Sequence, residues 1–178
     1  MFEGELAEQR VMIWQKDDFE ELFESGYGKE VEGKVELTLI ESMYLLKRGK
    51  LKIRAESKKK FFSEEDFFNY CKKTERNFHA KLVVYTDLRE KGFLVKTGFK
   101  FGCDFRVYER GVKLKKGPKQ AHEHTKWVVH AIPEEFSCSF PELSRAVRLA
   151  QNIRTEMIWA IVDSESDVTY YKITRISP

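Results

Sequence analysis

Residues 97–111 constrain the fold of this 178-residue chain more than any other stretch. Every second position from 99 to 107 is apolar, as in a strand with one buried face: Phe99, Phe101, Cys103, Phe105 and Val107. The pattern predicts a strand over 100–108 with Tyr108 at its end. A second strand is predicted to begin near Trp127, so the segment between them is a long connection inside one sheet.

That connection is basic. Between positions 110 and 119 it carries five cationic side chains and no acid: Arg110, Lys113, Lys115, Lys116 and Lys119. The net charge of the whole chain is only +3, which does not identify a nucleic-acid binder, whereas a local concentration of cations can. RNA phosphate binding is one interpretation, because each cation beside a phosphate releases counterions. An ordinary solvated loop is the other.

His124 closes the connection. Histidine is the side chain best suited to move a proton near neutral pH, so His124 is a candidate acid or base, with a surface histidine as the alternative. Tyr108 becomes a candidate base if neighbouring cations stabilise its anion or if it hands the proton onward; otherwise it is structural. His122 and His124 could face one way as metal ligands, but no acid or cysteine cluster completes such a site. We expect no metal and no cofactor.

Three further features have two interpretations each. Asp104 would suit a metal-dependent nuclease, but no Glu-x-Lys follows on an adjacent strand, which counts against that class. Arg148, on a predicted helix, could stack on an unpaired RNA base or form a surface ion pair. The acidic turn at 163–167 is either a solvated hairpin or an interaction loop.

The remaining sequence predicts two closely joined halves. Capping patterns at Thr38-x-x-Glu41, Ser63-x-x-Asp66 and Ser139 predict helix starts, as does Asp18 before Phe19. We expect an α/β (α+β) protein with a small N-terminal α/β domain followed by a mixed sheet flanked by helices. The predicted domains are 1–82 and 83–178.

Composition predicts a cytoplasmic protein. Hydrophobic residues make up 42% of the chain, enough for a real core. Cys71, Cys103 and Cys138 fit no metal-site spacing and indicate a reducing compartment. No apolar run approaches the roughly 18 residues that span a bilayer, and the N-terminus lacks a signal-peptide pattern, so we expect no membrane association.

Several blocks together resemble the archaeal tRNA-splicing endonucleases: K-T-G-F-K-F-G-C-D-F-R-V-Y-E-R-G (96–111), H-E-H-T (122–125), V-R-L-A (147–150), A-I-V-D (160–163), E-S-M-Y-L-L (41–46) and L-V-V-Y-T-D-L-R-E-K-G (82–92). The resemblance covers nearly the whole chain and implies an N-terminal α/β domain with a C-terminal nuclease domain. It implies cleavage of precursor tRNA at a bulge-helix-bulge motif without metal. The ribose 2′-OH attacks the adjacent phosphate, leaving a 2′,3′-cyclic phosphate and a 5′-OH.

The resemblance also implies roles for single residues. Tyr108 matches a tyrosine that helps deprotonate the 2′-OH, and His124 matches a histidine that protonates the departing oxygen. The lysine that stabilises the transition state is replaced by Thr155, next to Arg154. The chain is therefore a weakened or Arg154-rescued catalytic subunit, a subunit whose partner supplies the chemistry, or a carrier of an inactivating substitution.

RNA and subunit contacts follow from the same resemblance. Arg148 matches an arginine that clamps a bulge base, with Arg175 as its partner, and the basic connection contacts RNA. The acidic residues Asp163, Glu165 and Asp167 match a loop that inserts into a basic groove of another subunit. The final strand, predicted over 168–176, matches one that pairs subunits edge to edge. The implied partners are precursor tRNA and either identical or paralogous subunits in a tetramer.

Overall fold

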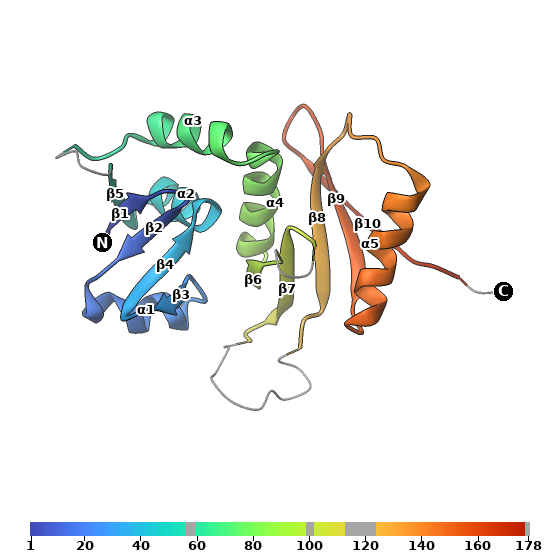
Figure 1. Cartoon of the computed structure of the whole chain (residues 1–178), viewed down its shortest axis with the longest axis horizontal. Helices are drawn as coiled ribbons and strands as arrows, with labels where there is room; N and C mark the ends of the chain where they lie inside the picture. Colours follow the sequence, from blue (N-terminus) through green and yellow to red (C-terminus); the bar gives the residue numbers. More distant parts are fainter. Residues whose placement is uncertain (56–59, 99–101, 113–123, 177–178) are drawn as a thin grey trace. The chain divides into compact units, whose positions relative to one another are not determined.

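The computed structural model describes residues 1–55, 60–98, 102–112 and 124–176. The chain divides into two compact units, Met1–Phe78 and His79–Pro178, each with its own five-stranded sheet in the described ranges (Figure 1). The predicted α+β fold class is confirmed, since each unit combines a mixed sheet with helices. Within these ranges no helix is both long and apolar enough to cross a membrane.

The first unit is a sheet with strand order β3-β4-β2-β1-β5. Its elements are β1 (Phe2–Ala7), β2 (Arg10–Ile13), the 3₁₀ turn η1 (Lys16–Asp18), α1 (Phe19–Glu24), β3 (Lys29–Val31), β4 (Lys34–Thr38), α2 (Leu39–Lys47), β5 (Leu51–Arg54) and α3 (Glu64–Thr74). β1 runs parallel to β5, and the other pairings are antiparallel. Sequence patterns missed β1 and β3.

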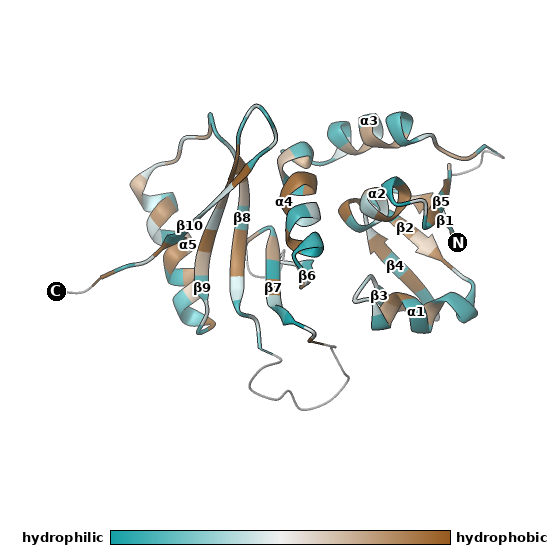
Figure 2. Cartoon of the chain, turned by 180° about the vertical axis from the view of Figure 1, so that it is seen from behind, coloured by the Kyte–Doolittle hydropathy of each residue, from teal (hydrophilic) through white to brown (hydrophobic). Residues whose placement is uncertain are grey.

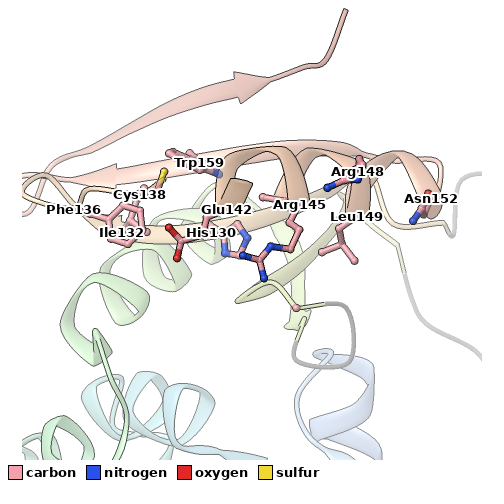
Figure 3. A pocket seen from close by; sticks show the side chains of 12 residues that line it. His130, Ile132, Phe136, Cys138, Glu142, Arg145, Arg148, Leu149, Asn152 and Trp159 are labelled. Atoms are coloured by element: carbon pink, nitrogen blue, oxygen red, sulfur yellow. The ribbon is translucent and has the colours of Figure 1, made fainter. Parts of the chain in front are cut away.

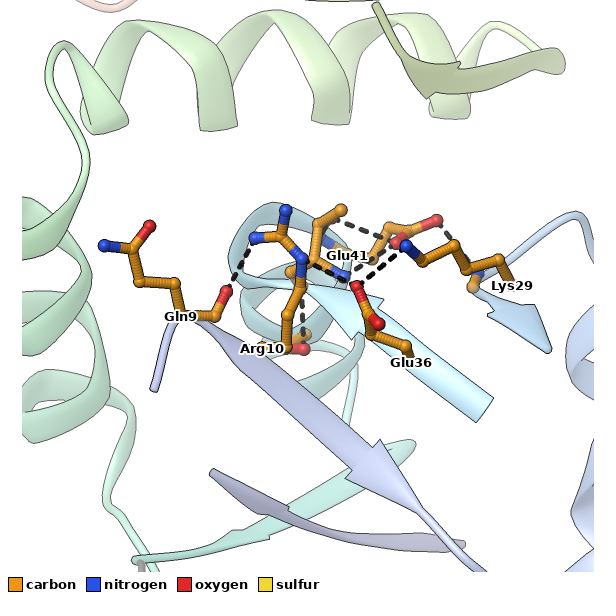
Figure 4. A network of polar contacts seen from close by, with 8 residues as sticks. Gln9, Arg10, Lys29, Glu36 and Glu41 are labelled. Carbon is orange, nitrogen blue, oxygen red and sulfur yellow. Dashed lines mark hydrogen bonds and ion pairs between the residues drawn. The ribbon is translucent and has the colours of Figure 1, made fainter. Parts of the chain in front are cut away.

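Helix α2 is buried from Leu39 to Leu45 and contacts β2, β4, β5 and α3. Its predicted capping box is present: the Thr38 hydroxyl accepts from the Glu41 amide, and the Glu41 carboxylate accepts from the Thr38 amide at 2.9 Å. The same carboxylate accepts from the Gly28 amide at 3.0 Å, which ties the loop before β3 to the helix start. Nearby, Glu36 binds Arg10 and Lys29 across the sheet surface (Figure 4).

Capping was predicted correctly at three helices and wrongly at one. Ser63 and Ser139 accept hydrogen bonds from the amides three residues on, and Ser139 forms a full capping box with Glu142. Asp18 makes no side-chain cap because its backbone is already helical, as the last residue of η1. A cap needs an extended backbone at that position.

The second unit has strand order β10-β9-β8-β7-β6. Its elements are α4 (Phe78–Glu90), β6 (Phe93–Thr97), β7 (Phe105–Arg110), β8 (Trp127–Pro133), α5 (Phe140–Asn152), β9 (Glu156–Val162) and β10 (Val168–Ile173). β8 and β9 are parallel and joined through α5, and the remaining pairings are antiparallel.

Helices α4 and α5 cover opposite faces of this sheet (Figure 1). Tyr85 of α4 packs against Phe105, with ring centroids 5.8 Å apart. Ala150 of α5 packs with Val128 and Met157, which point the other way. Strands β8 and β9, in the middle of the sheet, are apolar along most of their length (Figure 2). A strand buried on both faces reads as a nearly continuous apolar run.

Two predicted strands have different limits. β7 begins at Phe105 rather than at position 100, and β10 ends at Ile173 rather than at 176. Gly102 has a φ of +63°, and the turn that it starts brings the Cys103 Sγ to the Gly98 carbonyl at 3.6 Å. A Cβ on Gly98 would lie 2.3 Å from that sulfur. Cys103 is therefore buried although it lies in a turn. The alternation of apolar residues predicted a strand at this position, and β7 begins only at Phe105.

We predict that Glu41→Ala lowers the free energy of unfolding by about 3 kcal/mol, because three partly buried donors lose the charged acceptor that the buried Glu41 supplies. Urea denaturation followed by circular dichroism measures the change. The matched control is Glu142→Ala, which removes the same kind of capping box at the exposed start of α5 and should cost much less. An equal loss of unfolding free energy in the two variants would contradict the explanation that burial makes the Glu41 capping box the stronger one.

Candidate active site

Tyr108 lies inside β7 and is 1% exposed. The predicted position at the strand end is wrong, because β7 continues to Arg110. Just beyond Tyr108 the pairing with β6 shifts: Leu94 pairs with Tyr108, whereas Phe93 pairs with Arg110. Glu109 is thus an extra residue, a β-bulge of the kind that redirects side chains near active sites.

His124 is exposed and lies three residues before β8 begins. The chain rejoins β7 directly after it, since the Lys126 amide donates to the Val107 carbonyl at 2.8 Å. Tyr108 and His124 therefore both lie at the end of the sheet where β7 finishes and β8 starts. The two chain segments meet there although sixteen positions separate the residues in sequence.

Thr155 reaches the same end of the sheet from the other side of β8. It lies between α5 and β9, and its hydroxyl donates to the Lys126 carbonyl at 2.6 Å. Arg154 precedes it with a φ of +54°, in the turn that ends α5. Arg154 is exposed and is not a strand residue, so strand alternation does not decide its direction.

The basic connection is described only at its ends. Lys113, Lys115, Lys116, Lys119 and His122 lie outside the described residues, as do Phe99 and Phe101. Arg110 is exposed, with its guanidinium 4.9 Å from the centre of the Phe93 ring. Phe93 in turn contacts Trp127 at 5.2 Å between ring centroids. The described start of the connection thus carries a cation over the Phe93 ring, which itself contacts Trp127.

Arg148 is exposed on α5 and lines a cavity of about 790 Å³ between α5 and the sheet (Figure 3). Arg145, His130 and Trp159 line the same cavity. The Arg148 Nε donates to the Ser144 carbonyl at 3.4 Å, within its own helix. Arg175, the suggested partner of Arg148, is an exposed residue after β10.

One carboxylate of the acidic turn after β9 accepts hydrogen bonds from the main chain of the same turn. The Asp163 Oδ1 accepts from the amides of Glu165 and Asp167, each at 2.9 Å. The Ser164 amide donates to the Glu134 side chain, which ties the turn to the end of β8. Glu165 and Asp167 are exposed and remain the outward-facing acids of the turn.

Asp104 is engaged in a structural network that the sequence did not indicate. Its carboxylate accepts from the Ala131 amide at 2.9 Å and lies 3.3 Å from the Lys81 Nζ and 3.6 Å from the His130 Nδ1. Burial alone would raise the pKa of Asp104, but these contacts outweigh burial and hold the pKa below its usual value. In the described ranges no three His, Cys, Asp or Glu side chains form a group that could hold a metal ion.

Sequence comparisons match both units to one family. Residues 2–68 match the family model for the tRNA intron endonuclease N-terminal domain, and residues 78–170 match that for the catalytic C-terminal domain. The chain belongs to the tRNA intron endonuclease family. The resemblance expected from the sequence is thereby confirmed, and tRNA splicing and endoribonuclease activity are what this family is named for.

Individual relatives match this tRNA intron endonuclease chain over most of both sequences. A tRNA-splicing endonuclease of Thermococcus kodakarensis is 41% identical over 169 residues, covering 94% of each chain. That of Thermococcus gammatolerans is 44% identical over 147 residues, covering 83% of this chain and 81% of the relative. That of Methanothermobacter thermautotrophicus is 36% identical over 177 residues, covering 99% and 98%.

Sequence patterns missed one residue that the tRNA intron endonuclease fold brings to the candidate site. Lys126 contacts β7 through its amide and Thr155 through its carbonyl. Its only signal in the sequence was its place two residues after His124. A lysine in a basic region carries no distinguishing pattern, so its position became informative only in the folded chain.

We predict that Asp104→Asn destabilises the protein by about 2 kcal/mol at pH 7. The lowered pKa means that the stabilisation is fully present above the unfolded carboxyl pKa of about 3.9 and is lost as the pH falls through the folded value. The difference in unfolding free energy between the two proteins should therefore narrow below about pH 4. Asp167→Asn, at an exposed acid, is the control. A gap that widens on acidification would contradict this assignment.

Proposed function

We propose that this chain is a subunit of a tRNA-splicing endonuclease that cuts precursor tRNA at intron–exon junctions within a bulge-helix-bulge motif. The observation that carries the proposal is the meeting of Tyr108, His124 and Thr155 segments at one end of the second sheet. The family membership supports the reaction class. The enzyme would act in the cytoplasm as a tetramer of identical or paralogous subunits.

The proposed reaction is a metal-independent transesterification. The ribose O2′ forms a bond to phosphorus while the bond from phosphorus to O5′ breaks, giving a 2′,3′-cyclic phosphate and a 5′-OH. Tyr108 would accept the 2′-OH proton as its phenolate, an anion that neighbouring cations such as Arg106, 5.9 Å from the ring centre, would stabilise. His124, protonated beforehand, gives its proton to the departing O5′. His124 is exposed and Tyr108 is buried, so an incoming phosphate would reach His124 first.

RNA and subunit contacts extend the same proposal. Arg148, with Arg175, would hold an unpaired base by stacking, and Arg110 with the neighbouring lysines would contact phosphates. The exposed acids Glu165 and Asp167 would enter a basic groove of another subunit. β10 pairs only with β9 among the described strands, which leaves one edge open for strand pairing between subunits.

A second candidate function is a structural or RNA-binding subunit that is inactive by itself. Thr155 favours it, because a neutral hydroxyl replaces the lysine expected from the resemblance. In that case a paralogous subunit would supply the chemistry, and this chain would position the RNA. Cleavage by the chain alone separates the two candidates.

We predict that the chain alone cuts bulge-helix-bulge RNA in EDTA and leaves cyclic-phosphate ends. His124→Ala should slow cleavage at least 100-fold by removing the leaving-group acid. His79→Ala, which alters another exposed histidine of the same unit, is the control. Full activity of His124→Ala would reject the assignment, and cleavage only after a paralogous subunit is added would favour the structural candidate. Activity lost in EDTA and restored by Mg²⁺ would reject metal independence.

Tyr108→Phe removes the hydroxyl and keeps the buried ring. We predict a cleavage rate at least 10-fold lower with a loss of unfolding free energy of no more than about 1.5 kcal/mol, because proton acceptance needs the oxygen whereas most of the packing comes from the ring. Single-turnover kinetics and urea denaturation measure the two effects. Normal cleavage would identify Tyr108 as a core residue without a chemical role.

A further inference from the structure

Attack of O2′ on the phosphate adds negative charge to the oxygens around phosphorus in the transition state. A positive group held in place beforehand is the most effective way to stabilise such charge. Position 155, where the family resemblance leads one to expect a lysine, is neutral in this chain. The residues around Thr155 are therefore where a replacement cation is to be sought.

Thr155 touches such a residue directly. Its hydroxyl donates to the Lys126 carbonyl at 2.6 Å, and its own amide donates to the Ala150 carbonyl of α5 at 3.0 Å. Thr155 is thus anchored to the helix end and holds Lys126, the residue before β8, in place. A lysine side chain at 155 could not donate this hydrogen bond from the same position, because the threonine oxygen is bonded to Cβ whereas the lysine nitrogen is separated from Cβ by three methylene groups.

Lys126 is held from both sides. Its amide donates to the carbonyl of Val107, the residue before Tyr108, at 2.8 Å. It follows His124 by two positions, and Thr155 binds its carbonyl. The backbone of Lys126 therefore adjoins each of the three segments that form the candidate site.

The Lys126 side chain is accessible and has a partner that a phosphate can replace. It is 34% exposed, and its Nζ lies 2.6 Å from the Glu109 Oε1, at the bulge of β7. The same Nζ lies 4.5 Å from the centre of the Trp127 ring, which holds it in place by a cation–π contact. Glu109 is itself 47% exposed, so the ion pair faces solvent and exchanges readily.

We propose that Lys126 supplies the positive charge that stabilises the transition state and that Thr155 is a positioning residue for it. The proposal rests on the proposed function. In the resting protein the amine binds Glu109, and the flexible lysine stem lets it turn to the scissile phosphate when RNA binds. Lys126 makes no covalent bond and exchanges no proton with the substrate.

The first test is single-turnover cleavage of bulge-helix-bulge RNA. Lys126→Ala should lower the rate about 100-fold, the usual effect of removing one charge-stabilising donor, while the RNA Kd changes less than about 3-fold. Lys126→Arg should retain part of the rate. Lys29→Ala removes another exposed lysine that is ion-paired to a glutamate, Glu36 of the first unit, and it should cleave normally. Normal cleavage by Lys126→Ala would overturn the proposal.

The second test moves the charge. Thr155→Lys, introduced into Lys126→Ala, should restore the rate at least 10-fold, because a cation returns to the same end of the sheet. No recovery, with RNA binding and unfolding free energy intact, would overturn the proposal. An inactive natural chain that cleaves once it carries Thr155→Lys alone would overturn the role of Lys126 and leave the proposed reaction standing. Inactivity of all these proteins would overturn the proposed function itself.

The third test addresses Thr155. Thr155→Val keeps the shape of the side chain and removes the donor, so the single-turnover rate should fall about 5-fold or more at unchanged RNA Kd. Thr155→Ser keeps the hydroxyl and should restore most of the rate. Equal rates for the natural protein and Thr155→Val would show that the hydrogen bond to Lys126 does not position the amine.

Discussion

The parallel pairing of β8 with β9 is the constraint on which the candidate site depends. Parallel neighbouring strands begin at the same end of a sheet, and here α5 returns the chain to the end at which β8 began. β7 is antiparallel to β8, so it ends where β8 begins. The same end of the sheet consequently receives three separate parts of the sequence, which contain Tyr108, His124 and Thr155.

This end of the sheet is held together by two hydrogen bonds to the main chain of Lys126. Its amide joins β7, and its carbonyl accepts from Thr155. The bulge at Glu109 then places a carboxylate beside the lysine amine. This arrangement gives Thr155 a structural task that a simple loss of the expected lysine would not suggest.

Helix starts were the most predictable features of the fold. Thr38, Ser63 and Ser139 were assigned correctly because a cap is a local interaction between residues three apart. β1 was missed although Phe2, Gly4 and Leu6 alternate inward, since the glycine and glutamates weaken the pattern. Cys103 misled the assignment of β7 because a turn residue and a strand residue can be equally buried.

The sequence by itself determined the family and the α+β class, because these depend on residue types and local spacing. It also made Tyr108 and His124 candidates for the base and the acid. Only the tertiary structure decided that Tyr108 is buried while His124 is exposed, that Asp104 is committed to Lys81 and His130, and that Thr155 holds Lys126. The physical reason is that strand register and the return of the chain through α5 bring distant residues together. Neither can be predicted from the residue spacing within a single segment.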